Sequence, residues 1–71
     1  MSTFNDFLAV VDGLPSGTVF SVTCDWCVAQ GLQLTPGMAI SWGRSFAQCY
    51  SSYNTTCVST GTDNHRNYKK L

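Results

Sequence analysis

Hydrophobic residues near the start of the chain recur with the period of an α-helix. The recurring positions are Phe4, Phe7, Leu8 and Val11. This spacing puts them on one side of a helix, which would be turned toward a core. Thr3 precedes the run and Asp6 lies three residues further on, as in a capping box with Asp in place of Glu. Gly13 is expected to end this helix and to lead into the turn Leu14-Pro15-Ser16-Gly17.

A short strand and a short helix are predicted next. Residues 18–22 are mostly β-branched or aromatic and lie between turn residues, which favours a strand. Thr23 is a suitable N-cap and Gly31 a suitable stop, so residues 24–30 are predicted to form a helix of about two turns. The side chains expected to be buried there are Trp26, Cys27 and Val28.

The longest predicted helix begins at Thr35-Pro36, with Thr as the cap and Pro in the first turn, and runs to about Ser52. Its apolar positions alternate by three and four residues, at Ala39, Trp42, Phe46, Cys49 and Tyr53. The opposite face carries Ser41, Arg44, Ser45, Gln48 and Ser51. A solvated helix face usually carries Glu and Lys pairs. The nearly uncharged face found here favours a surface that a ligand or partner covers, with plain solvent exposure as the alternative.

The last part of the chain is predicted to form a β-hairpin. Residues 55–59 and 65–69 resemble strands, and Gly61-Thr62-Asp63-Asn64 between them resembles a turn. Alternation along the second strand would place Arg66 and Tyr68 on one side and Asn67 and Lys69 on the other. The hairpin could serve as a charged edge or as a surface that contacts phosphates.

Composition limits the functions that fit. A chain of 71 residues with 44% hydrophobic residues predicts one small domain, covering residues 1–71. Its zero net charge hides a split: residues 1–42 carry a charge of −3, and residues 43–71 carry +3. Such a dipole orients a chain on a polyanion, but four basic side chains predict only modest DNA affinity. No signal peptide or membrane segment is recognisable, so we expect a cytoplasmic protein that does not contact membranes.

The four cysteines leave three alternatives open. Cys24 and Cys27 have the spacing of a zinc knuckle or a redox pair, whereas Cys49 and Cys57 are too far apart for a standard knuckle. In a reducing cytosol, buried structural thiols are favoured over a four-thiolate zinc site or a disulfide. We therefore predict no metal and no cofactor.

The predicted order of helix, strand, short helix, longer helix and hairpin resembles the winged helix-turn-helix family. The residues that carry the resemblance are Leu14-Pro15-Ser16-Gly17-Thr18, Trp42-Gly43-Arg44-Ser45-Phe46 and His65-Arg66-Asn67-Tyr68-Lys69. Together these segments resemble small winged-helix proteins encoded by bacteriophages and mobile elements. The fold implied is α+β, and the function implied is a small nucleic-acid-binding regulator that acts as a homodimer or within a complex.

The resemblance also implies a binding site. In that family the third helix enters the major groove and the hairpin, or wing, lies along the backbone. By position, the base-facing residues would be Ser41, Arg44, Ser45 and Gln48. The phosphate-facing residues would be His65, Arg66, Lys69 and Lys70. Arg44 would pair with guanine and Gln48 with adenine.

A second hypothesis is a phage-encoded inhibitor of a host protein complex, such as an anti-CRISPR or other anti-defence protein. The near-neutral charge suits docking on a protein, and Tyr50, Tyr53 and Tyr68 are candidate anchors. An enzyme is not expected. His65 is the single histidine, and neither a phosphate-binding glycine loop nor an acid pair is present in the sequence.

Overall fold

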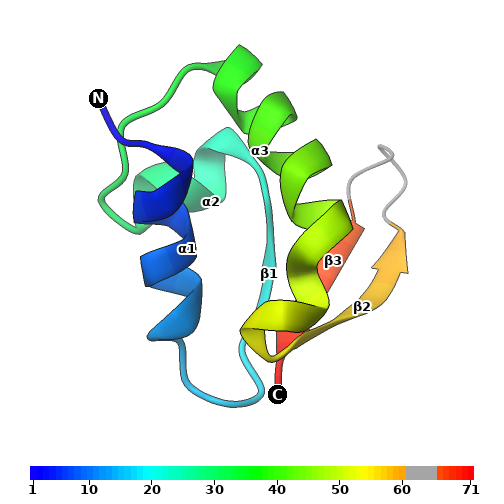
Figure 1. The fold of residues 1–71 in the computed structure, drawn as a ribbon. Coiled ribbons are helices and arrows are strands. Elements are labelled where there is room, and N and C mark those ends of the chain that lie inside the picture. The colour runs from blue at the N-terminus through cyan, green and yellow to red at the C-terminus, as the bar shows by residue number, and fades with distance from the viewer. Residues whose placement is uncertain (61–65) are drawn as a thin grey trace.

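The protein is an α+β fold of three helices and a three-stranded antiparallel sheet, in a computed structural model that describes residues 1–60 and 66–71 (Figure 1). The elements are α1 (Phe4–Asp12), β1 (Val19–Ser21), α2 (Cys24–Ala29), α3 (Pro36–Cys49), the 3-10 helix η1 (Tyr50–Tyr53), β2 (Thr55–Thr60) and β3 (Arg66–Lys70). This is the element order that the sequence predicts. The single longer helix expected to reach Ser52 instead ends at Cys49 and continues as η1.

Threonine side chains fix where all three α-helices begin. At α1, the Thr3 hydroxyl accepts a hydrogen bond from the Asp6 amide at 3.3 Å, and the Asp6 carboxylate accepts one from the Thr3 amide at 2.8 Å. The predicted capping box is therefore confirmed. At α2 and α3 the cap is a single bond: the Thr23 hydroxyl accepts from the Trp26 amide and the Thr35 hydroxyl from the Met38 amide, both at 3.2 Å. Gly31 adopts a φ of +86° just beyond α2, which explains why a glycine ends that helix.

The last strand in sequence is the central strand of the sheet. The strand order is β1-β3-β2, and both neighbours run antiparallel to β3. Phe20 of β1 and Cys57 of β2 lie opposite Tyr68 on its two sides. The predicted hairpin is confirmed as β2 paired with β3, with a register shift beside Val58. The predicted turn at residues 61–64 lies outside the described residues.

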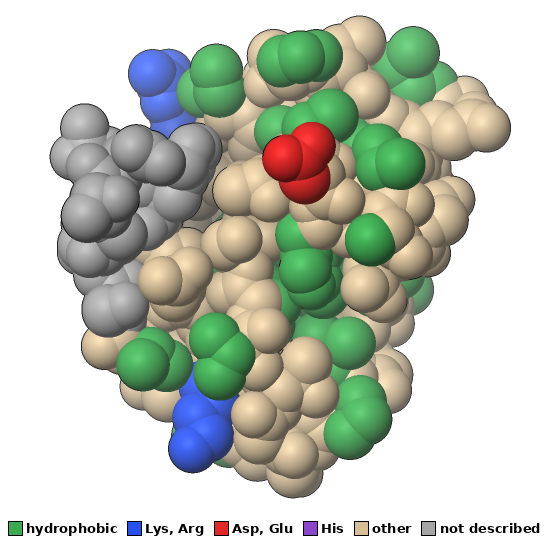
Figure 2. Space-filling model, turned by 180° about the vertical axis from the view of Figure 1, so that it is seen from behind, with side chains coloured by type: hydrophobic (Ala, Val, Ile, Leu, Met, Phe, Trp, Pro, Cys, Tyr) green, Lys and Arg blue, Asp and Glu red, His purple; other side chains and the backbone are tan. Residues whose placement is uncertain are grey.

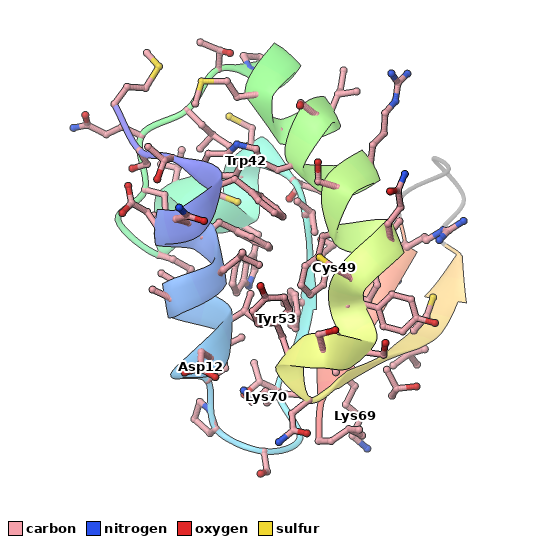
Figure 3. All side chains as sticks on the ribbon, viewed as in Figure 1. Asp12, Trp42, Cys49, Tyr53, Lys69 and Lys70 are labelled. Atoms are coloured by element: carbon pink, nitrogen blue, oxygen red, sulfur yellow. The ribbon has the colours of Figure 1, made fainter. Side chains whose placement is uncertain are left out.

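The core is a continuous network of aromatic rings between the helices and the sheet. α3 runs in front of β3 in Figure 1. The rings of Phe46 and Tyr68 pack edge to face, with their centroids 4.8 Å apart. The ring centroid of Phe7 in α1 lies 5.4 Å from that of Phe46 and 5.8 Å from that of Trp42. Trp42 points between α1 and α3 in Figure 3. Every Phe, Tyr and Trp of the chain belongs to this network.

One expected core residue lies at the surface. Val28 of α2 is 55% exposed, so the prediction that it is buried is wrong. Cys27 is fully buried, as predicted, and Trp26 is half-buried against the core. Because α2 has only six residues, it turns one narrow face inward, and Val28 lies outside that face.

Candidate nucleic-acid interface

The polar flank of α3, which we define as Ser41, Arg44, Ser45 and Gln48, is exposed along its length. Trp42 and Phe46, on the other side of the same helix, are buried at 5% and 0% exposure. The sequence therefore predicted the orientation of α3 correctly. The flank presents two hydroxyls, one amide and one guanidinium to solvent, which are groups that hydrogen-bond base edges or a polar protein surface.

A groove runs beside this flank, between α3, the β1–α2 junction and β3. One wall is formed by Val22, Thr23, Cys24 and Asp25, and β3 contributes Arg66 and Tyr68. The wall on α3 is formed by Pro36, Ala39, Ile40, Gly43, Arg44 and Ala47. Arg44 is the member of the polar flank that also borders this groove. The structure thus brings Arg44 and Arg66, from different elements, to one concave surface.

The groove reveals a face of α3 that the sequence analysis missed. Pro36, Ile40, Gly43 and Ala47 are spaced by four, three and four residues, which is the same helical repeat that identified the core face. Ile40 is 59% exposed, and its neighbours on this face carry small side chains or none. The signal was present in the sequence as a second stripe beside the aromatic one. Its small residues do not resemble core positions, so hydrophobic periodicity alone does not single it out.

Arg66 and Tyr68 lie on the same side of β3, as predicted. Burial raises the pKa of the Tyr68 phenol, and the nearby Arg66 guanidinium opposes part of that rise. Arg66 is exposed and Tyr68 is 2% exposed, so the arginine lies over the rim of the groove while the tyrosine closes its base.

The other basic residues predicted to face phosphates differ in where the structure places them. Lys69 is exposed on the opposite side of β3 and points away from the molecule in Figure 3. His65 lies outside the described residues. On the back of the molecule, Figure 2 shows basic side chains at separate places rather than in one patch. The exposed basic side chains of residues 1–60 and 66–71 are Arg44, Arg66 and Lys69.

Lys70 corrects the sequence-based picture, because it is buried. Its side chain is 7% exposed and points toward the end of α1 and toward Tyr53 (Figure 3). The ammonium group donates to the carbonyl oxygens of Val11 and Asp12 at 3.1 Å and of Tyr53 at 3.5 Å. A cation at the C-terminal end of a helix stabilises it, and α1 has no basic residue of its own in its last turn. Lys70 therefore joins three segments and is not available to a phosphate.

The tyrosines proposed as interface anchors belong to the core instead. Tyr68 is buried, and Tyr50 and Tyr53 are half-buried and pack against the core. None of the aromatic side chains, all of which lie in the described part of the chain, is exposed. Within residues 1–60 and 66–71, no exposed Phe, Tyr or Trp ring is thus offered to an unpaired base.

All four cysteines are free thiols in the structure. Burial, with a smaller contribution from Cys24, raises the pKa of Cys27 to about 11. Cys27 is therefore protonated at neutral pH, and a protonated thiol is a poor nucleophile and a poor metal ligand. Within residues 1–60 and 66–71, no three His, Cys, Asp or Glu side chains are grouped so that they could hold a metal ion.

Comparison with family models, with curated protein sequences and with solved structures finds no match to this chain. Among the described helices, none is long and apolar enough to cross a bilayer.

Proposed function

We propose that this protein is a small winged-helix protein that binds double-stranded nucleic acid through the polar flank of α3. The observation that carries the proposal is the exposed flank of Ser41, Ser45 and Gln48, with Arg44 at its edge and Arg66 across the groove. The strand order β1-β3-β2 and the hairpin after α3 support the winged-helix class, in which a helix and a hairpin act together.

The chemistry of the flank favours a duplex over a single strand. Single-strand binding proteins combine basic grooves with exposed aromatic rings, and here every Phe, Tyr and Trp side chain is buried or partly buried. Amide and guanidinium groups on a helix are suited to base edges in a major groove, where each bidentate pair adds about 1–3 kcal/mol of discrimination. Gln48 and Arg44 are the residues assigned to that role.

The affinity is expected to be modest and only moderately dependent on salt. Each phosphate contact adds about −0.9 to the slope of log K against log salt concentration. Arg44, Arg66 and Lys69 are the exposed cations of the described chain, so one protomer is expected to give a slope no steeper than roughly −3.

The test is fluorescence anisotropy with short mixed-sequence duplexes and with the matching single strands, over a salt series. Gln48→Ala is expected to lower the preference between duplex sequences, while Gln30→Ala, an exposed glutamine at the end of α2, should leave it unchanged. Arg66→Ala is expected to lower the affinity for all duplexes and to reduce the salt slope by about 1. Wild-type protein that binds no duplex at low salt would refute the proposal.

The low number of exposed cations supports a second candidate, an inhibitor that docks on a protein complex. The burial of Lys70 lowers that number below the one expected from the sequence. A stoichiometric protein complex that survives nuclease treatment and gel filtration, combined with no duplex binding, would favour this candidate.

A further inference from the structure

We infer that Cys24 and Cys27 form a redox-active dithiol, which a low-molecular-weight disulfide such as oxidised glutathione converts to an intramolecular disulfide in the first turn of α2. The inference does not depend on nucleic-acid binding, because neither cysteine belongs to the polar flank of α3. It rests on three observations: the two residues lie one helical turn apart, one of them borders the groove, and the other lies in the core.

The helix holds the two cysteines at a separation that a disulfide spans. The Thr23 cap places Cys24 and Cys27 at the first and fourth positions of α2. With a rise of roughly 1.5 Å per residue and a radius of roughly 2.3 Å, an α-helix keeps Cα atoms three residues apart at about 5 Å. Disulfides join Cα atoms that are roughly 4.4–6.8 Å apart. The backbone of α2 thus already has the spacing that the bond needs.

The two thiols differ in which of them a dissolved molecule can reach. Cys24 is half-buried and lines the groove beside α3, and its Sγ donates to the Leu34 carbonyl oxygen at 3.8 Å. Cys27 is 0% exposed. A disulfide in solution therefore meets Cys24 first, and Cys27 is reached only by a sulfur already bonded to Cys24. This difference makes Cys24 the attacking thiol and Cys27 the resolving thiol.

The exchange consists of two displacements. The Cys24 thiolate attacks one sulfur of oxidised glutathione, which breaks the glutathione S–S bond, forms a mixed disulfide on Cys24 and releases one glutathione thiolate. Cys27 then gives its proton to solvent, and its thiolate attacks the Cys24 sulfur, which forms the Cys24–Cys27 bond and releases the second glutathione thiolate. Two thiols lose two electrons and two protons, and one glutathione disulfide is reduced to two glutathione molecules.

The second displacement depends on pH. Burial, with a smaller contribution from the neighbouring Cys24, raises the pKa of Cys27 to about 11. The thiolate fraction of Cys27 therefore rises about tenfold for each pH unit below that value. Since the thiolate is the nucleophile, closure of the ring is expected to accelerate as the pH rises.

Closure changes one wall of the groove. The Cys24 sulfur turns toward Cys27 and has no hydrogen left to donate, so its contact with the Leu34 carbonyl oxygen ends. Leu34 precedes Thr35, whose hydroxyl caps α3. The disulfide thus alters the link between α2 and the start of α3. In reducing compartments disulfides are usually transient, and many of them sense redox conditions in this way.

The test uses the full chain with Cys49→Ser and Cys57→Ser, a background that leaves Cys24 and Cys27 as its only thiols. After incubation with excess oxidised glutathione under native conditions, intact-mass spectrometry is expected to show the loss of two hydrogens. Peptide mapping should show Cys24 linked to Cys27, and wild-type protein should yield the same linked peptide. Excess reduced glutathione should restore both thiols.

Two further variants in that background separate the roles of the thiols. Cys27→Ala should stop at the mixed disulfide and gain one glutathionyl group on Cys24. Cys24→Ser should leave the buried Cys27 unmodified. Circular dichroism would verify that each variant folds. Free thiols in the treated background protein, glutathione that stays on Cys24 while Cys27 is present, or glutathione on Cys27 of a folded Cys24→Ser variant would each overturn the inference.

Discussion

The two apolar faces of α3 differ in what covers them. On one face, Trp42 and Phe46 lie beneath a continuous network of rings from α1 and β3. On the other, Ile40 and Gly43 face an open groove. A small chain buries only part of its apolar surface. Here the ring network lies on the covered side of α3, and Tyr68 is the one ring that also borders the groove. The covered face therefore accounts for most of the burial on α3, whereas the groove face is left open in the structure.

The largest expected effect on stability comes from removing the ammonium group of Lys70, which joins α1, η1 and β3. Lys70→Met keeps the apolar stem but leaves the carbonyls of Val11, Asp12 and Tyr53 without their charged donor. We expect the free energy of unfolding to fall by about 3–4 kcal/mol, measured by urea denaturation.

Lys69→Met provides the control, since Lys69 is exposed on the other side of the same strand. Its effect should stay within about 0.5 kcal/mol. Equal losses for the two variants would show that the contacts of Lys70 do not contribute to stability.

The next effect is a loss of stability at alkaline pH, caused by the burial of the Cys27 thiol. Because burial raises the pKa of Cys27 from 9.0 to about 11, the folded state favours the protonated thiol. The associated stability is complete below pH 9 and is lost as the pH rises toward 11. The loss is expected to be roughly 2–3 kcal/mol, read from urea denaturation at several pH values.

Cys27→Ala should be less stable at neutral pH but should lose less stability between pH 9 and 11. Burial also raises the pKa of Tyr68, so part of the alkaline loss should remain in this variant. A variant whose pH dependence matches that of the wild type would argue against a dry environment around Cys27.

The smallest expected effect tests whether a methyl group fits at Gly43, on the groove face of α3. Gly43→Ala adds a methyl group that meets only ordinary contacts with Val22, and it removes the helix penalty of glycine. We expect the melting temperature of the dilute protein to rise, corresponding to about 0.5–1 kcal/mol. Alanine at the exposed position Ser45 serves as a reference for helix propensity alone. A destabilised Gly43→Ala variant would mean that the groove is tighter than described.

Local chemistry made most of the fold predictable. Thr3, Thr23 and Thr35 each precede a helix and cap it through contacts three residues away, so the signal and the interaction lie together in sequence. The same holds for the aromatic stripe of α3. These features depend on neighbours within one or two turns.

The errors come from contacts between residues far apart in sequence. Nothing near Lys70 indicates that its ammonium group reaches the end of α1, 58 or 59 residues earlier. The groove likewise needs α3, the β1–α2 junction and β3 together. The polar flank could be predicted because its orientation follows from the core stripe on the same helix. The separation of Lys69 from Lys70 could not, because it depends on what packs against each side of β3.

The position of β3 in the sheet has a consequence for synthesis. β1 pairs with a strand that begins 45 residues after β1 ends, and β2 pairs with the same strand. While residues 66–70 are still inside the ribosome, neither strand has its hydrogen-bonding partner, and Phe20 and Phe46 lack the Tyr68 ring against which they pack. Cooperative folding of residues 1–71 therefore requires β3 to have emerged, however early β1 and β2 are made.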